Sequence, residues 1–125
     1  MRVYRTDWDG VDVVRLAGVV DGKDAEMLVE RLGSSHRGSD WCCVLDFSRV
    51  RHVDYRAFSA FERLTRSSCG VIFSGFDDYL LSILALVSDR EMTPVFSTWR
   101  KALRHLMTER GKIGVAAAAG KAGDA

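Results

Sequence analysis

The chain is 125 residues long, with 47% hydrophobic and 28% charged residues. This composition is that of an ordinary globular domain and excludes disorder of the chain as a whole, and the length suffices to close one hydrophobic core without metals or disulfides. Its 18 basic and 17 acidic residues leave a formal net charge of +1, so no whole-protein field attracts nucleic acid or a membrane surface.

The cysteines indicate free thiols rather than a disulfide framework. There are three of them, and Cys42 and Cys43 are adjacent, which directs their side chains to opposite faces of a strand. We expect all three to be buried hydrophobes in a reducing compartment. The first residues lack the apolar core of a signal peptide, and no apolar run approaches the ~20 residues of a membrane span, so we predict a cytoplasmic protein.

The first third of the chain predicts a hairpin followed by a helix. Two segments rich in β-branched and aromatic residues, Arg2–Thr6 and Val11–Ala17, flank a four-residue loop that ends in Asp-Gly. The helix that follows has Asp21 or Asp24 as its candidate N-cap. Its apolar residues recur at helical spacing at Ala25, Leu28, Val29 and Leu32.

The middle of the chain predicts a buried strand and a second helix. Residues 41–47 are apolar apart from Asp46, which is typical of a central parallel strand buried on both faces. Asp54 is placed to cap the helix that follows. The apolar stripe of this helix consists of Ala57, Phe58, Phe61, Leu64 and Thr65.

The remainder repeats the alternation of strand and helix. Residues 71–73 form a short strand, and Asp77 or Asp78 opens a third helix. After Pro94, residues 95–96 form a last short strand, and Ser97 caps a fourth helix. The inward-facing residues of the last two helices are Leu80, Ile83, Leu84 and Val87, then Trp99, Ala102, Leu103 and Leu106.

This order predicts an α/β fold. Since crossovers between parallel strands are right-handed, we expect a mixed, mostly parallel sheet of about five strands covered by about four helices. Residues 1–110 are expected to form a single domain. Residues 111–125 are rich in Ala and Gly, have too little bulk to dock, and are predicted to be a disordered tail.

Three segments resemble the STAS family of bacterial anti-sigma-factor antagonists. They are residues 16–21 (LAGVVD) before the first helix, residues 44–54 (VLDFSRVRHVD) leading into the second, and residues 73–76 (FSGF) before the third. Their order and the order of the predicted elements both match the family from about residue 11 to residue 107. The resemblance implies the STAS fold for nearly the whole folded part.

The resemblance also implies a partner-switching role. Such a domain binds an anti-sigma factor or a related kinase and is released when one serine is phosphorylated. That serine lies two residues after the family's aspartate, which Asp54 matches, but here Arg56 occupies the serine position and Ala57 replaces the family glycine. The usual phosphorylation switch is therefore missing.

Arg56 leaves two interpretations open. A phosphoserine in the first turn of a helix complements the helix dipole, whereas Arg56 places a fixed positive charge there. Either the domain is permanently in the partner-binding state, or Arg56 and free amides at the helix start bind an anion, with Arg49, Arg51 and His52 adding to the patch. The resemblance implies the following partner-binding or anion-binding residues: Asp21, Asp54, Tyr55, Arg56, Ala57, Gly75 and Phe76.

The third helix is apolar at nearly every position. Leu81 and Leu86 lie away from its predicted core stripe, and a helix that is apolar all round needs cover on two faces. Either the C-terminal helix and neighbouring loops provide that cover, or this side is a dimer or partner surface.

The sequence shows no catalytic machinery, metal site or cofactor-binding loop. Its histidines at 36, 52 and 105 lack ligand spacing, no phosphate-binding glycine motif is present, and no serine has a recognisable paired base. The basic stretch at 100–105 is predicted to be the solvated face of the last helix. We therefore expect no enzyme, no cofactor, no metal and no nucleic-acid ligand.

Three hypotheses about function remain. The first is a regulatory interaction module for an anti-sigma factor, a kinase or another regulatory protein, able to form a homodimer. The second is a STAS-like cytoplasmic subunit of a lipid ABC transporter, since such domains also serve as transporter accessories. The third is a sensor of a small anion or nucleotide, held by Arg56 and the helix start.

Overall fold

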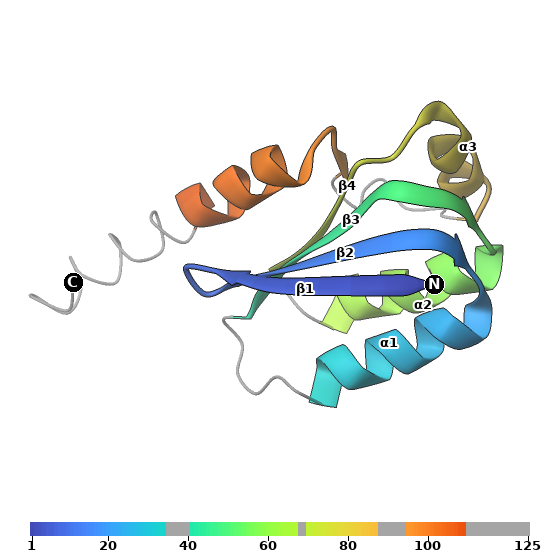
Figure 1. Cartoon of the computed structure of the whole chain (residues 1–125), viewed down its shortest axis with the longest axis horizontal. Coiled ribbons are helices and arrows are strands. Elements are labelled where there is room, and N and C mark those ends of the chain that lie inside the picture. The colour runs from blue at the N-terminus through green and yellow to red at the C-terminus, as the bar shows by residue number, and fades with distance from the viewer. Residues whose placement is uncertain (35–40, 68–69, 88–94, 110–125) are drawn as a thin grey trace, which may run out of the picture.

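Five strands form one mixed sheet with the spatial order β1-β2-β3-β4-β5 (Figure 1). The computed structural model describes residues 1–34, 41–67, 70–87 and 95–109. The strands are β1 (Arg2–Trp8), β2 (Val11–Val20), β3 (Cys42–Val53), β4 (Gly70–Ser74) and β5 (Val95–Phe96). The first pair is antiparallel and every later pair is parallel. The prediction of an α/β fold with a mixed, mostly parallel sheet is confirmed.

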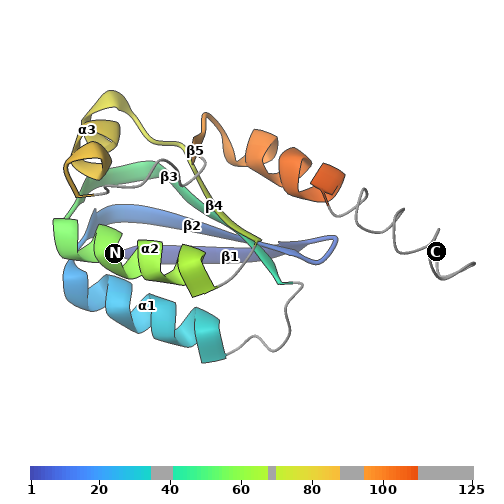
Figure 2. The same ribbon diagram turned by 180° about the vertical axis from the view of Figure 1, so that it is seen from behind.

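Helices cover both faces of this sheet. α1 (Gly22–Ser34) and α2 (Tyr55–Ser67) lie side by side on one face, and α3 (Asp78–Val87) lies at the end of the sheet where β3 leads into α2 (Figure 1). Figure 2 shows from behind that the helix at residues 99–109 lies on the opposite face from α1 and α2. The described residues thus contain the four helices that the sequence predicted.

The turn between β1 and β2 is tighter than predicted. Trp8 pairs with Val11, so Asp9 and Gly10 alone connect the two strands. Both central residues have positive φ, 52° and 84°, as a type I′ turn requires. The expected four-residue loop is therefore wrong, because its first two residues continue the ladder of β1.

Carboxylates begin the helices that follow β2 and β4. Asp21 Oδ1 accepts a hydrogen bond from the amide of Asp24 at 2.8 Å, and Asp77 Oδ1 accepts one from the amide of Leu80 at 2.8 Å. Asp21 and Asp77, rather than Asp24 and Asp78, are therefore the N-caps. Each satisfies an amide that the helix itself leaves unpaired.

The C-terminal helix begins one residue later than predicted. Thr98 Oγ1 accepts a hydrogen bond from the amide of Lys101 at 3.2 Å, and its carbonyl accepts one from the amide of Ala102 at 3.1 Å. Thr98 is thus the N-cap, and the assignment of this role to Ser97 is wrong. The side chains of the basic stretch at 100–105 that were predicted to be solvated are exposed.

β3 continues six residues beyond the apolar run from which it was predicted. Its buried positions change from consecutive residues to every third residue, at 47, 50 and 53. The pairing with β2 explains this spacing. Four residues of β3, 46–49, lie opposite three residues of β2, 15–17. Three residues of β3, 50–52, lie opposite two residues of β2, 18 and 19. Each shift adds one residue to β3, and such β-bulges bend a strand and redirect its side chains.

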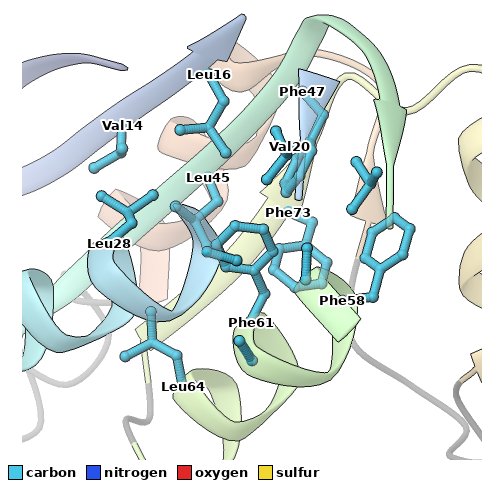
Figure 3. Close-up of a cluster of buried hydrophobic side chains, with 14 of the residues drawn as sticks. Val14, Leu16, Val20, Leu28, Leu45, Phe47, Phe58, Phe61, Leu64 and Phe73 are labelled. Carbon is cyan, nitrogen blue, oxygen red and sulfur yellow. The ribbon is translucent and has the colours of Figure 1, made fainter. Parts of the chain in front are cut away.

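Phe47 of β3 belongs to the main hydrophobic core, which lies between the sheet and α1, α2 and α3 (Figure 3). Four aromatic rings surround it, with centroid distances between 4.7 and 6.2 Å. They belong to Phe58, Phe61, Phe73 and Phe76. Because most of these rings meet edge to face, they add favourable quadrupole contacts to the burial of apolar area.

A second, smaller core lies under the helix at residues 99–109. It joins apolar side chains of β2, β3 and β4 to Ala102 and Leu106. Cys42 faces this smaller core whereas Cys43 faces the main one, as the alternation of strand side chains predicted. Both are buried thiols outside any disulfide, and burial raises the pKa of the Cys43 thiol well above its usual value.

Some expectations lie outside the described residues, namely those for Cys69, His36 and the tail at 111–125. Among the helices that the structure describes, none has the length and apolar character needed to cross a bilayer. The described ranges also contain no cluster of three His, Cys, Asp or Glu side chains arranged to hold a metal ion.

Candidate functional site

The first turns of α1 and α2 lie beside each other at the carboxyl ends of β2 and β3. The amide of Asp54 donates to the carbonyl of Val20 at 2.9 Å, which ties the two strand ends together. A hollow of about 400 Å³ lies between the helix starts. It is lined by Asp21, Gly22, Lys23, Glu26, Asp54 and Arg56. We call these six residues, together with Tyr55, the helix-start surface.

Asp54 caps α2 as the sequence predicted. Its Oδ1 accepts a hydrogen bond from the amide of Arg56 at 3.0 Å. Its carbonyl accepts bonds from the amides of Ala57 and Phe58 at 2.9 and 3.2 Å. The amides of residues 56–58 are therefore already paired, and the expectation that free amides of this helix start would hold an anion is wrong for these three.

Tyr55 and Arg56 project from the start of α2. Tyr55 is 58% exposed, and the guanidinium carbon of Arg56 lies 5.9 Å from the centroid of its ring. A side-chain hydrogen bond to Tyr55 raises the pKa of Arg56, and the negative charge of Asp54 acts in the same direction. Arg56 is a cation whose guanidinium lies over the Tyr55 ring, within the distance of a cation–π contact.

The helix-start surface carries charges of both signs. Asp21, Glu26 and Asp54 supply carboxylates, and Lys23 and Arg56 supply cations. Glu26 also forms an ion pair with Arg63, which joins α1 to α2. Carboxylates outnumber cations in the hollow itself, so it disfavours a small free anion, whereas mixed charge is typical of a surface that recognises another protein.

Arg49, Arg51 and His52 do not join Arg56 in one basic patch. Arg49 is the register partner of Ala17, and Arg51 lines a separate pocket that also includes Ala17. His52 Nδ1 lies 2.6 Å from the hydroxyl of Tyr79 on α3. The prediction of a shared patch is wrong because the two bulges of β3 direct these side chains elsewhere.

Two predicted binding residues are core residues instead. Ala57 has no exposed surface and packs in the main core. Phe76 is partly buried, and its ring stacks on that of Phe73 with a centroid distance of 5.6 Å. A partner cannot touch the side chain of Ala57, so its assignment to the binding surface is wrong. Phe76 contributes chiefly to packing.

Gly75 adjoins a buried polar network that the sequence reasoning missed. The carboxylate of Asp46 is 1% exposed and accepts hydrogen bonds from Ser48 Oγ at 2.6 Å and Ser74 Oγ at 2.9 Å. Arg15 Nε lies 3.6 Å from the same carboxylate. A Cβ on Gly75 would lie 2.6 Å from Asp46 Oδ1. The available signal was a single acidic residue within an apolar strand, because a buried charge needs partners.

The outer side of α3 is exposed. Leu81 is 40% and Leu86 is 86% exposed. The helix at residues 99–109 packs on the other face of the sheet, in the smaller core, and does not cover them. The C-terminal helix therefore does not provide the cover that the first alternative assigned to it together with neighbouring loops, and the loop at 88–94 lies outside the described residues. The two leucines remain candidates for a dimer or partner contact.

Comparison with known proteins identifies the fold. No family model and no curated protein matches the sequence. Among solved structures, an anti-sigma factor antagonist from Mycobacterium paratuberculosis is similar, with a TM-score of 0.73, 20% identity, and coverage of 85% of this chain and 93% of that one. An anti-sigma-factor antagonist (STAS) domain protein from Planctomyces limnophilus has a TM-score of 0.60, 17% identity, and coverage of 83% and 96%.

A transporter contains a similar unit. The murine Solute Carrier 26 family member A9 anion transporter has a TM-score of 0.68 and 16% identity over 82% of this chain. The match spans only 18% of the transporter chain. At these identities the likeness establishes the fold: the chain has the STAS-like α/β fold of anti-sigma-factor antagonists, as the resemblance in its sequence implied.

Proposed function

We propose that this chain is a non-enzymatic interaction module that docks on a regulatory protein, such as an anti-sigma factor or a kinase, through the helix-start surface. The observation that carries the proposal is the pairing at the start of α2. Asp54 occupies the amides there, while Tyr55 and Arg56 project outward. The groups left for recognition are thus side chains of both charges and an aromatic ring, which suit a protein partner.

The charge of Arg56 sets how this module is regulated. An arginine lacks the hydroxyl that is phosphorylated in a serine, and its guanidinium keeps its positive charge at every physiological pH. The module therefore stays competent to bind, and control comes from the partner or from the amount of this protein. The similarity to anti-sigma-factor antagonist structures supports a regulatory partner.

The proposal is tested by replacing Arg56 with a negative charge. Tagged wild-type protein and the Arg56→Asp variant are purified from cells of the source organism, and co-purifying proteins are identified by mass spectrometry. Each identified regulator is then purified and titrated by calorimetry. We expect the Arg56→Asp variant to bind at least about tenfold more weakly, because it opposes the partner's charges at the contact.

Two further variants distinguish an effect at the helix-start surface from a general effect of changed charge on α2. Arg66→Asp makes the same change of charge in the last turn of α2 and should leave the affinity unchanged. Gly22→Ala keeps all charges, but its Cβ would lie 2.9 Å from the Cβ of Arg56 and should displace that side chain and weaken binding. If a regulator binds wild type and Arg56→Asp equally well, the helix-start surface is not the contact.

A second candidate function is that of an accessory domain in a transporter. Its support is the similarity to part of an anion transporter. That similarity favours a transporter-associated role in general and does not single out an ABC-transporter subunit. Genes for a permease and an ATPase beside this gene would favour it, and a neighbouring sigma-factor regulator would favour the first proposal.

A further inference from the structure

The sheet presents a basic surface on the face opposite α1 and α2. β2 alternates regularly, with Val14 and Leu16 in the main core, so Ala17 and Val19 point to the other face. Tyr4 of β1 is the register partner of Arg15 and shares that face. These residues lie on the same face as the helix at 99–109.

That helix covers only one end of the face. Trp99 contacts Trp8 with a ring distance of 5.8 Å, and Ala102 packs near Val11, all close to the β1–β2 turn. At the opposite end of the hairpin, Val19 is 46% exposed although it is apolar. This end of the face is open to solvent in the part of the chain that the structure describes.

The bulges of β3 bring arginines to the open end. The second bulge inserts residue 51 between the positions that pair with 18 and 19 of β2. Arg51 consequently lines a pocket of about 520 Å³. The other lining residues are Met1, Arg2, Ala17, Gly18 and Val19. Arg49, the register partner of Ala17, shares the face and is exposed.

The charge of this surface is unbalanced. The pocket lining among the described residues contains two arginines and no acidic residue. Arg15, further along the same face, is neutralised by the buried Asp46. We call Arg2, Tyr4, Ala17, Val19, Arg49 and Arg51 the arginine face. It combines exposed guanidinium groups with small apolar side chains and one tyrosine, which is 50% exposed.

We propose that the arginine face binds an extended acidic segment of a partner protein, in which carboxylates alternate with apolar residues. Guanidinium groups hold carboxylates by paired, charge-assisted hydrogen bonds. Because successive side chains of an extended segment point to opposite sides, every second residue, a carboxylate, would face the arginines. β1 is the terminal strand of the described sheet, so an extended segment can also align along its edge.

A protein segment fits this face better than a nucleic acid does. The formal net charge is only +1, so the long-range attraction that supports nonspecific binding to phosphate chains is weak. The arginine face also lies across the sheet from Arg56. Its occupancy is therefore independent of the proposed docking through the helix-start surface, and the two can be tested separately.

The test uses the full chain and three fluorescent probes. These are a synthetic peptide of alternating Glu and Val, a matched peptide of Lys and Val, and oligothymidylate, titrated by fluorescence anisotropy at low and moderate salt. The decisive variant is Arg2→Glu/Arg51→Glu, and the control is Arg66→Glu on α2. Circular dichroism and urea midpoints establish that each variant is folded.

We expect the Glu-Val peptide to bind wild type with an affinity that decreases as the salt concentration rises. The affinity of the double variant for this peptide should be lower by about tenfold or more. Arg66→Glu and Arg56→Asp should change that affinity less than about twofold. Amide resonances of residues 17–19 should shift on titration. No binding of the Glu-Val peptide, equal binding by the double variant, or tighter binding of oligothymidylate would each overturn the proposal.

Discussion

Replacing Gly75 with alanine tests whether the network around Asp46 is rigid. Gly75 has a φ of +77°, and a Cβ there would lie 2.6 Å from Asp46 Oδ1 and 2.7 Å from the backbone nitrogen of Ser48. Gly18 provides a matched control, because its φ is +91° but an added Cβ would meet nothing within 4 Å. Both substitutions incur backbone strain, and only that at Gly75 incurs a steric clash.

The expected magnitudes follow from these two contributions. Left-handed backbone costs a residue with a Cβ about 1–2 kcal/mol, which is the whole effect expected for Gly18→Ala. Forcing extra volume into a packed site costs about 1–3 kcal/mol more, so Gly75→Ala should lower the free energy of unfolding by about 2–5 kcal/mol. The backbone nitrogen of Ser48 belongs to β3 and cannot move aside as a flexible side chain would.

Urea unfolding followed by tryptophan fluorescence and circular dichroism measures both values. With a slope of about 1–3 kcal/mol/M, the two midpoints should be clearly separated. Equal losses for Gly75→Ala and Gly18→Ala would refute the argument, because they would mean that the network yields to the added methyl group at no cost. A change of slope in either variant would indicate an altered denatured or native state rather than strain.

Three further predictions concern the cap, the core and a buried thiol. Asp54→Ala should lose about 1 kcal/mol in urea unfolding, because the amide of Arg56 loses its acceptor, and an unchanged midpoint would contradict the capping role. Phe47→Ala should lose about 3–5 kcal/mol and Phe47→Leu clearly less, since four rings surround that side chain; equal losses would argue against a packed aromatic centre. Burial raises the pKa of Cys43. The thiol of Cys43 therefore stays protonated in the folded state at a pH at which it ionises in the unfolded state, about 8.5. Its contribution to stability is complete below that pH and is lost as pH rises toward the folded pKa, so urea titrations should show a steeper decline in wild type than in Cys43→Ala.

The alternation of strands and helices could be predicted because it depends on local patterns. Apolar periodicity and turn residues located each described element, and the Asp54 cap followed from residue type and position. The end of β3 could not be found in this way. Its buried positions at every third residue arise from two bulges, and these depend on pairing with β2, a strand that is distant in sequence.

The candidate site was predictable in part. The sequence placed Asp54 at one helix start and either Asp21 or Asp24 at another; the structure selects Asp21 and brings it into one hollow with Asp54 and Arg56. The sequence analysis also grouped Arg51 with Arg56 because they are close in the chain. In the structure the two side chains line different pockets. Nearness in sequence does not decide which face of a sheet a side chain reaches, because each residue inserted by a bulge shifts the following side chains to the opposite face.

The sequence by itself therefore determined the class of the fold and the Asp54 cap, and it places Arg56 where the resemblance expects a serine, since these depend on residue type and short-range spacing. Only the tertiary structure decided which predicted residues reach solvent. Ala57 is enclosed by the main core, the amides of residues 56–58 are paired, and Arg49 and Arg51 of β3 lie on the opposite face. Those outcomes depend on packing and register between segments far apart in the chain, which local patterns do not encode.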